Sequence, residues 1–386
     1  MKSSIVGRVI YLDNNGTTRM LPQVKERIVS LMDLPHNPSS IHTFGRNAKN
    51  IVEEARDNIL HAFNLDRFDG YTLTFTSSGT EANNLLLNNF KNNNILVSAI
   101  EHPSILASKH HFEKLIEIKV GKNGIIDLND LEDKLKASSG QTTLVSAMFA
   151  NNETGIIQPL KEVIELAKQY GAYTHSDMVQ AIGKVNLNLK DLDLDFITIS
   201  SHKIGGPLGA GALIRKEKID LKAFILGGGQ EKGLRSGTEN VYAIAGFSEA
   251  CKYLELMANS MEQIIVLREG LESAITEFCK EAVIIGKSAP RLPNTSLIIM
   301  PNVKSPIQLM NFDLANIAVS SGSACSSGKV GGSHVLKAMS IPDKLAECAV
   351  RVSLSFDQQI SDIDYFVEHW KNIYLRLAAN IEQVAV

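Results

Sequence analysis

The apolar positions of the chain follow two spacings, one typical of strands and one typical of helices. Short apolar runs rich in β-branched or aromatic residues predict strands over residues 71–75, 95–100, 142–150, 172–177, 196–200 and 210–215. Helical spacing predicts helices over residues 22–32, 47–63, 104–115 and 160–170. Strands that alternate with helices in this way predict an α/β fold with a mostly parallel central sheet covered on both faces.

The alternation stops after residue 215 and a different pattern follows. A glycine-rich segment is succeeded by helical spacing over residues 241–280, and short apolar runs then predict a small sheet. Those runs are residues 284–285, 295–300, 318–319 and 350–354, and residues 360–381 predict a closing helix. Because 386 residues are many for a single core, we expect a large domain over residues 19–255 and a smaller α+β domain formed by residues 1–18 and 256–386.

Composition narrows the classes of partner. The net charge is −3 and the 21% of charged residues form no long runs, which argues against nucleic acid or an anionic membrane as the main partner. No apolar run approaches the roughly 20 residues that cross a bilayer, and the first residues lack a signal-peptide core, so we expect a cytoplasmic protein. The four cysteines have no CxxC spacing and are expected to be reduced thiols.

A lysine follows one of the predicted core strands. Lys203 lies between the strand at residues 196–200 and a glycine-rich turn that contains Pro207. A lysine held near apolar walls has a depressed pKa, and its neutral amine can form a Schiff base with a carbonyl cofactor. The alternative is a loop lysine whose ammonium group extends to water.

Three more predicted strand ends carry groups that suit a phosphorylated cofactor. Gly79 and Thr80 begin a helix, where backbone N–H groups and a hydroxyl favour a phosphate, although an ordinary N-cap explains this motif equally well. Asp177 could hold a pyridine nitrogen protonated and Gln180 could bond a phenolic oxygen, although Asp177 is as easily an N-cap. His102 could stack on a flat cofactor and move protons, or be structural.

Six motifs spread along the chain resemble those of the cysteine desulfurases of the NifS/IscS type, which belong to the aminotransferase-like pyridoxal-phosphate enzymes. They are Asn-Pro-Ser-Ser-Ile-His at residues 37–42, Asn-Asn-Glu-Thr-Gly at 151–155, Ser-Ser-His-Lys at 200–203, Gly-Gly-Gln-Glu at 228–231, Arg-Ser-Gly-Thr-Glu-Asn at 235–240 and Gly-Ser-Ala-Cys-Ser-Ser at 322–327. The resemblance covers nearly the whole chain and implies the fold-type I architecture of pyridoxal-phosphate-dependent transferases.

The resemblance also implies a role for each matched residue. Lys203 corresponds to the Schiff-base lysine and base, Asp177 to the partner of the ring nitrogen, His102 to the ring-stacking acid/base and Gln180 to the partner of the phenolic oxygen. The implied phosphate ligands are Gly79, Thr80, Ser200, His202 and, from the other subunit of a homodimer, Thr238. The implied substrate-binding residues are Asn14, Asn152 and Arg351. No metal site is expected.

Cys325 matches the persulfide-forming cysteine of the resembled family. It lies in residues 320–333, of which ten of fourteen are Ser or Gly, a composition that predicts a flexible arm able to collect sulfur and pass it on. Cys251, Cys279 and Cys348 are expected to be inert and buried. Two departures from the family pattern are Gly16, where alanine is usual, and an end at Val386 without the longer tail that housekeeping members use to bind their scaffold.

The resemblance implies removal of sulfur from L-cysteine, which gives L-alanine and a persulfide on Cys325, with pyridoxal 5′-phosphate as cofactor. The sulfur would pass to an acceptor protein such as an iron–sulfur scaffold, or serve tRNA thiolation. The alternatives are a pyridoxal-phosphate lyase or transaminase acting on another amino acid, and a catalytically silent member of an assembly complex. A nucleotide-binding oxidoreductase is disfavoured because residues 205–211 follow a late strand and do not spell G-x-G-x-x-G.

Overall fold

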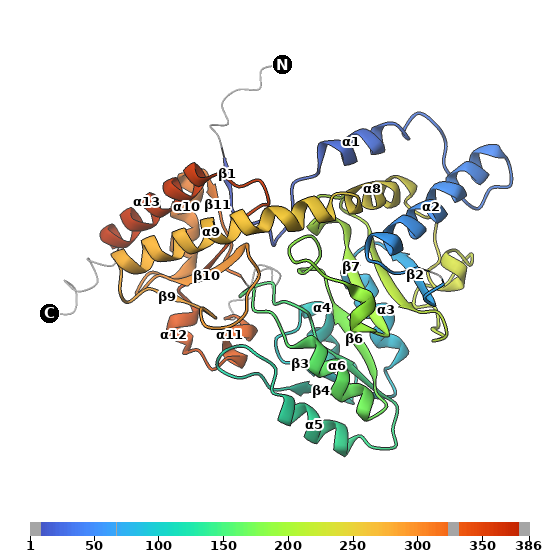
Figure 1. The fold of residues 1–386 in the computed structure, drawn as a ribbon, viewed down its shortest axis with the longest axis horizontal. Helices are drawn as coiled ribbons and strands as arrows, with labels where there is room; N and C mark the ends of the chain where they lie inside the picture. Colours follow the sequence, from blue (N-terminus) through green and yellow to red (C-terminus); the bar gives the residue numbers. More distant parts are fainter. Residues whose placement is uncertain (1–8, 67, 323–331, 378–386) are drawn as a thin grey trace.

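A large twisted sheet organises the first two thirds of the chain. The computed structural model describes residues 9–66, 68–322 and 332–377. Within them a seven-stranded sheet has the order β2-β8-β7-β6-β5-β3-β4 (Figure 1). Its strands are β2 (Tyr71–Thr76), β3 (Asn94–Ser98), β4 (Leu115–Ile118), β5 (Thr143–Ser146), β6 (Tyr173–Asp177), β7 (Phe196–Ser200) and β8 (Gly211–Lys216).

Most of this sheet is parallel, as the sequence predicts. Strands β4, β3, β5, β6 and β7 pair in parallel, and β8 is antiparallel to both β7 and β2. Every residue of β3, β5 and β7 is buried, as expected for strands of a parallel sheet with both faces covered. The carboxyl ends of the parallel strands therefore lie at one edge of the sheet.

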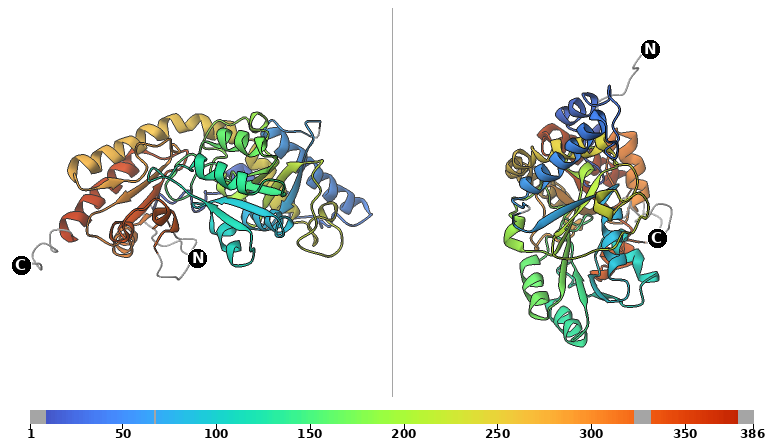
Figure 2. Two further views of the ribbon diagram at one scale, coloured as in Figure 1. Left: turned by 90° about the horizontal axis from the view of Figure 1, so that it is seen from below. Right: turned by 90° about the vertical axis from the view of Figure 1, so that its right-hand side faces the viewer.

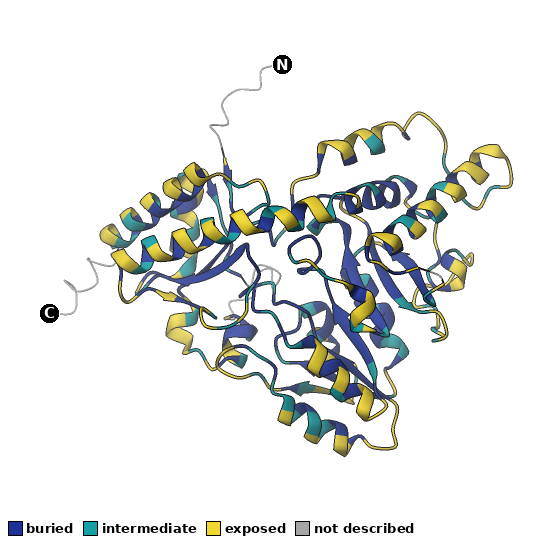
Figure 3. Ribbon diagram, viewed as in Figure 1, coloured by how far each residue is buried: buried dark blue, intermediate teal, exposed yellow. Residues whose placement is uncertain are grey.

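Helices cover both faces of the sheet. Leu96, Val145 and Ile197 point into a core shared with the helices on one face, and Ile95, Leu144 and Phe196 point into the core on the other. The first face is covered by α1 (Pro22–Val29), α2 (Thr43–Ala62), α5 (Leu128–Ala137), α6 (Leu160–Gln169) and α8 (Val241–Cys251). The second face is covered by α3 (Gly79–Asn89) and α4 (Pro103–Leu106). The helices expose their outer sides while the strands are buried (Figure 3).

One predicted helix is wrong. The sequence predicts a helix over residues 104–115, but α4 ends at Leu106, a 3₁₀ turn follows over Ala107–His110, and β4 begins at Leu115. Residues 115–118 are Leu-Ile-Glu-Ile, with Ile116 exposed by 41% at the edge of the sheet, so the strand resembled the tail of an amphipathic helix. Pairing with β3 decided its conformation.

The last third of the chain forms a second, smaller layer. Strands β9 (Val283–Ile284), β10 (Thr295–Ile299) and β12 (Ala349–Ser353) make an antiparallel sheet in the order β12-β10-β9. The run at 318–319, expected in this sheet, instead contributes β11 (Ile317–Ala318), which pairs with β1 (Ile10–Tyr11). The surrounding helices are α9 (Leu254–Phe278), α10 (Ser305–Leu314), α11 (His334–Ala338), α12 (Asp343–Ala346) and α13 (Ile360–Leu377). The remaining short helix, α7 (Leu189–Leu192), packs instead against the core of the large sheet.

The two layers are joined by the chain's amino-terminal segment and by the long helix α9. In two perpendicular views α9 extends from the region of α8 over the small sheet (Figure 2). Ile10, Leu12, Met261 and Trp370 share one core with the small sheet, which shows why the start and the end of the chain pack together. The domain boundaries expected from the sequence remain a prediction. No helix in the described part of the chain is both long and apolar enough to cross a bilayer.

Candidate active site

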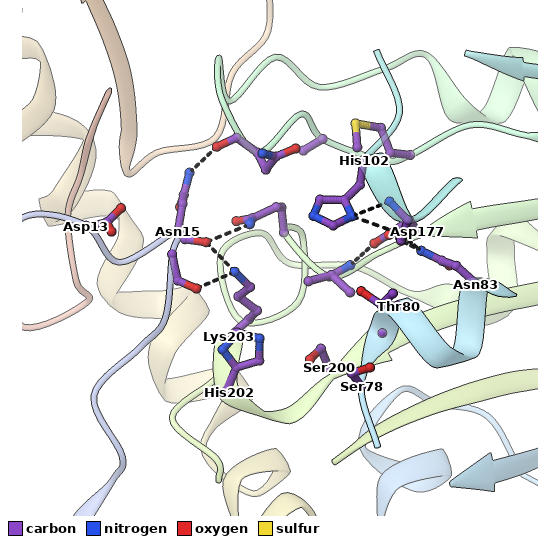
Figure 4. Close-up of a pocket in the computed structure, with 18 of the residues that line it drawn as sticks. Asp13, Asn15, Ser78, Thr80, Asn83, His102, Asp177, Ser200, His202 and Lys203 are labelled. Carbon is purple, nitrogen blue, oxygen red and sulfur yellow. Dashed lines mark hydrogen bonds between the residues drawn. The ribbon is translucent and has the colours of Figure 1, made fainter. Parts of the chain in front are cut away.

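A cavity of about 290 Å³ opens at the carboxyl ends of the parallel strands. Polar groups from separate strands converge on it (Figure 4). Its lining comprises Asp13, Asn15, Gly16, Ser78, Gly79, Thr80, Asn83, His102, Ser104, Met148, Ala150, Asn152, Asp177, Val179, Gln180, Ser200, His202, Lys203 and Arg351. The topology accounts for this convergence, because a parallel sheet brings the residues that follow each strand to the same edge.

Lys203 lies one short turn beyond β7, in the 3₁₀ turn Ser201–Lys203. Its Nζ donates to the backbone oxygens of Asn15 and Gly16, at 2.6 Å each. The hydroxyl of Thr18 donates to the Lys203 carbonyl at 2.8 Å, so the amino-terminal segment holds both the side chain and the backbone of this lysine. The amine is half-buried and faces the cavity.

Asp177 ends β6 with a carboxylate whose two oxygens are fixed separately. Oδ1 accepts the backbone N–H of Val179 at 3.0 Å, and Oδ2 accepts Nδ2 of Asn83 at 2.9 Å. Asp177 is 8% exposed and lines the cavity. A buried carboxylate held in this way can bind a cationic N–H of a ligand.

The opening turn of α3 forms another part of the cavity wall. Ser78 caps the helix by accepting the backbone N–H of Glu81 at 3.2 Å, while Thr80 is exposed. A Cβ added at Gly79 would lie 3.2 Å from Cγ2 of Val179, so this close packing suits glycine. The capping alternative thus holds for Ser78, and the remaining N–H groups of the first turn still favour an anion.

His202 and Ser200 border the same part of the cavity. Burial lowers the pKa of His202 to about 4, and the nearby Lys203 acts in the same direction. The ring is therefore neutral at neutral pH, and its Nδ1 lies 3.1 Å from Oγ1 of Thr17. Hydroxyl and imidazole N–H groups beside a helix amino terminus are suitable donors to a phosphate.

His102 follows β3 and caps α4. Its Nδ1 accepts the backbone N–H of Ser104 at 3.1 Å and lies 2.8 Å from the hydroxyl of the same residue. Burial lowers the pKa of His102, and Asp177 partly opposes that effect. Because Nδ1 is an acceptor, the neutral ring carries its proton on Nε2.

Arg351 reaches the cavity from the middle of β12. Its guanidinium donates to the backbone oxygen of Asn152 at 2.9 Å and to Oδ1 of Asp13 at 2.5 Å. Nε of Arg351 is buried without a hydrogen-bond partner among the described residues. A buried donor of this kind fits a carboxylate ligand, because a guanidinium can bind two carboxylate oxygens at once.

Gly16 lies close to Asp13, the carboxylate that pairs with Arg351. A Cβ at this position would lie 2.6 Å from Oδ2 of Asp13. The alanine usual in the resembled family would therefore press on Asp13. The departure noted in the sequence leaves room for the carboxylate where it stands.

Gln180 connects the cavity to a residue that the sequence interpretation missed. Its Nε2 donates to the Asn15 carbonyl at 3.1 Å and its Oε1 accepts Nζ of Lys184 at 2.6 Å. Lys184 is 3% exposed and also donates to Oδ1 of Asn15 at 2.7 Å. The sequence offered only a weak signal for Asn15 and Lys184, since an asparagine in a polar loop and a lysine after a glycine are ordinary surface residues.

Two of the predicted site residues, Asn14 and Thr238, do not line this cavity. Asn14 is buried, but its side chain is not part of the lining, whereas Asp13 and Asn15 on either side are. Thr238 is exposed and also lies outside the lining. Cys325 lies outside the described residues. The other three cysteines are buried, as expected, and burial raises the pKa of Cys251 and of Cys348.

Comparison with known proteins agrees with this geometry. Residues 10–366 match the model of the family described as aminotransferase class-V. The chain belongs to the class-V aminotransferase family. A cysteine desulfurase of Nostoc sp. is 37% identical over 383 residues, covering 96% of this chain and 94% of the relative. Cysteine desulfurase IscS of Dictyoglomus turgidum is 35% identical over 382 residues, covering 96% and 95%.

A solved structure is also similar over nearly the whole chain. The NifS-like protein of Rickettsia africae is 42% identical, with a TM-score of 0.90, and the match covers 95% of this chain and 99% of that one. The fold-type I architecture expected from the sequence is thereby confirmed.

Class-V aminotransferases use pyridoxal 5′-phosphate, and the cavity fits this cofactor. It offers an amine at Lys203 for the aldehyde and a buried carboxylate at Asp177 for the ring nitrogen. The amino terminus of α3 supplies donors for the phosphate. Gly79 lines the cavity at this helix terminus, where a Cβ would lie 3.2 Å from Cγ2 of Val179.

Proposed function

We propose that this protein is a pyridoxal-phosphate-dependent cysteine desulfurase. It would convert L-cysteine into L-alanine, with a persulfide on Cys325 that passes to a sulfur acceptor. The observation that carries the proposal is the arrangement of Lys203, Asp177 and Arg351 around one cavity, in a chain with cysteine desulfurases among its relatives over nearly full length. Each of the three suits a different part of a cofactor–amino acid pair.

The large sheet would hold the cofactor. Lys203 would bind its aldehyde and would also provide the amine that takes the Cα proton of the substrate. Asp177 would keep the ring nitrogen protonated, and His102 would lie against the ring and assist proton movement. The bound cofactor supplies an electron sink for the charge that develops at Cα.

Arg351 and Asn152 would bind the substrate carboxylate. The partnerless Nε of Arg351 supports this role, because a buried guanidinium N–H gains most from a charged acceptor. Asp13 already accepts from the same guanidinium, so a substrate carboxylate would share or replace that contact. Asn14 is assigned to this group by the family resemblance alone, since the cavity is lined by its neighbours Asp13 and Asn15.

The sulfur-transfer step is assigned to Cys325. Its thiolate attacks the substrate sulfur, a new S–S bond forms and the C–S bond breaks with its electron pair going to carbon. Protonation of that carbon leads to alanine, and the persulfide remains on Cys325. The described cysteines are poor substitutes, since burial raises the thiol pKa of Cys251 and Cys348.

We also propose a homodimer in which Thr238 binds the cofactor phosphate of the partner. The exposure of Thr238 supports this role. Leu226, which is 83% exposed in the same glycine-rich segment, supports a contact with a partner subunit there. A bridge between Ile225 and Arg235 ties the two ends of that segment together. The relative named IscS supports an acceptor in iron–sulfur cluster assembly, and the unpaired buried cysteines support a cytoplasmic location.

Turnover of L-cysteine tests the proposal. Purified protein supplied with pyridoxal phosphate, L-cysteine and a thiol reductant should release alanine and sulfide in equal amounts. Cys325→Ala should retain the cofactor and respond spectrally to L-cysteine, yet form almost no product, whereas Cys251→Ala should stay active. Alanine production by Cys325→Ala at the wild-type rate would contradict the mechanism.

A further inference from the structure

A second buried lysine lies beside the cavity, and the roles assigned above do not use it. Lys184 follows β6 in the turn after Gln180 and is 3% exposed. Its Nζ donates to Oε1 of Gln180 at 2.6 Å and to Oδ1 of Asn15 at 2.7 Å. Both acceptors belong to residues that line the cavity, so Lys184 supports the wall from behind.

The surroundings of Lys184 favour a neutral amine. Burial lowers its pKa well below the usual value, and the positive charges of Lys203 and Arg351 act in the same direction. A neutral amine has two N–H groups. These match the two amide oxygens that Lys184 contacts, so the residue acts here as a pair of hydrogen-bond donors.

The contacts of Lys184 set the orientation of the Gln180 amide. Oε1 faces the Lys184 donor, and Nε2 donates to the Asn15 carbonyl at 3.1 Å. A flipped amide would place Oε1 against that carbonyl oxygen and take an acceptor away from Lys184. The observed orientation leaves the second N–H of Nε2 for the cavity, which Gln180 lines.

Asn15 extends the same network to Lys203. The Asn15 carbonyl accepts both Gln180 Nε2 and Lys203 Nζ, while its side-chain oxygen accepts Lys184. Asn15 and Lys203 lie next to each other in the cavity wall (Figure 4). One asparagine thus accepts hydrogen bonds from both lysines.

We propose that Lys184 is a positioning residue, which locks the Gln180 amide so that an N–H group faces the phenolic oxygen of the cofactor and favours its ionised form. This inference rests on the proposed function, because it requires pyridoxal phosphate in the cavity. A donor to an ionised oxygen lowers the pKa of that oxygen, and removing the donor raises it.

The test is the pH dependence of the visible absorption of the bound cofactor. In Lys184→Met the donors are lost at similar side-chain length, the Gln180 oxygen loses its partner, and the midpoint pH of the cofactor band should rise by about one unit. Lys184→Gln, which keeps an N–H donor without a charge, should shift the midpoint less than Lys184→Met. Lys190→Met, at an exposed lysine of α7, should leave the midpoint unchanged.

A double-mutant cycle separates positioning from a direct charge effect. Gln180→Leu alone should raise the midpoint, and adding Lys184→Met to it should cause no further rise if Lys184 acts through Gln180. A full additional shift in the double variant would overturn the proposal, since it would assign the effect to charge acting through space. Should Lys184→Met not accumulate as soluble protein, Lys184→Gln is compared with Gln180→Leu in the same cycle.

The outcomes distinguish this inference from the proposed function. If the wild-type protein binds no pyridoxal phosphate, the proposed function fails. If it binds the cofactor and Lys184→Met keeps the wild-type midpoint, only the role of Lys184 fails. Reduced thermal stability with an unchanged midpoint would show that Lys184 is merely structural and would likewise refute the proposal.

Discussion

The large sheet and the small sheet contribute to the cavity in different ways. The large sheet presents Asp177, Ser200 and Lys203 from strand ends or from the turns that follow them. The small sheet presents Arg351 from the middle of β12, and its guanidinium donates to Asp13 of the amino-terminal segment, which also lines the cavity. We propose that the large sheet supports the cofactor, while Arg351 brings a substrate-binding group from the small sheet.

The junction between the two supports is a set of buried hydrogen bonds centred on Asn15. Its backbone N–H donates to Oγ of Ser353 in β12 at 2.9 Å, and its Nδ2 donates to Oγ1 of Thr295 in β10 at 2.9 Å. The Asn15 carbonyl accepts Lys203 from the large sheet. Changes on one side of this junction should therefore leave the chemistry of the other side measurable.

The largest effect on the cofactor side is expected from Asp177→Asn. The variant should fold, because Oδ1 of Asn83 has no partner among the described residues and the turned amide can accept from the new Nδ2, while the hydroxyl of Ser104 can donate where it now accepts. Loss of the negative charge beside the ring nitrogen should lower kcat by at least roughly 10²-fold. Steady-state alanine production measures the loss, with the cofactor content of each variant determined from its absorbance. A wild-type kcat at full cofactor content would show that the charge of Asp177 is not needed for turnover.

Arg351→Leu should act on the substrate side alone. Two charge-assisted hydrogen bonds are worth about 3 kcal/mol together, so KM for L-cysteine should rise about 10²-fold while the cofactor spectrum stays as in the wild type. Arg351→Lys keeps the charge but cannot bind two carboxylate oxygens at once, so its KM for L-cysteine should lie between those of the wild type and Arg351→Leu. If the spectrum and cofactor retention change as much as KM does, the two supports are not separate.

The smallest expected effect is on the pH dependence of stability, through a histidine buried in the large sheet. His175 in β6 lies 2.8 Å from Oγ of Ser146 in β5 and 3.1 Å from Oγ1 of Thr198 in β7, and so connects three parallel strands. Burial lowers its pKa to about 3. The unfolded chain binds this proton near pH 6.5, so stability from this residue is complete above that pH and is lost as the pH falls toward 3.

His175→Gln removes the imidazole that takes up this proton in the unfolded chain. Its free energy of unfolding should therefore fall less than that of the wild type between pH 8 and pH 5, by about 2 kcal/mol. Denaturant unfolding at both pH values measures the difference, and effects of other buried groups such as Glu101 cancel in it. Equal losses in the two proteins would place the acid sensitivity elsewhere.

Much of the large sheet was predictable from the sequence, and the small sheet less so. Buried parallel strands such as β3 contain short apolar runs, and the polar residues that follow such strands mark the cavity directly. The edge strand β4 was mistaken for helix because its exposed side gave it no continuous apolar run. Strand β11 was placed in the wrong sheet because its two residues carry no information on their partner.

The residues that were missed share one property, which is that their role depends on packing between distant segments. Lys184 has the composition of a surface residue, and only the fold brings it to Asn15, 169 positions away in the sequence. The pairing of Asp13 with Arg351 spans 338 positions. Patterns along the chain show which residues follow a strand, but they do not show which side chains meet across two sheets.

The central claim is that the large sheet carries the cofactor on Lys203, and chemical trapping tests it most directly. Borohydride reduction of the protein loaded with pyridoxal phosphate, followed by peptide mapping, should find the phosphopyridoxyl label on the peptide that contains Lys203. Lys203→Ala treated identically should carry no label, and Lys184→Met should be labelled like the wild type. A label on Lys184 or on any other lysine of the wild-type protein would contradict the account.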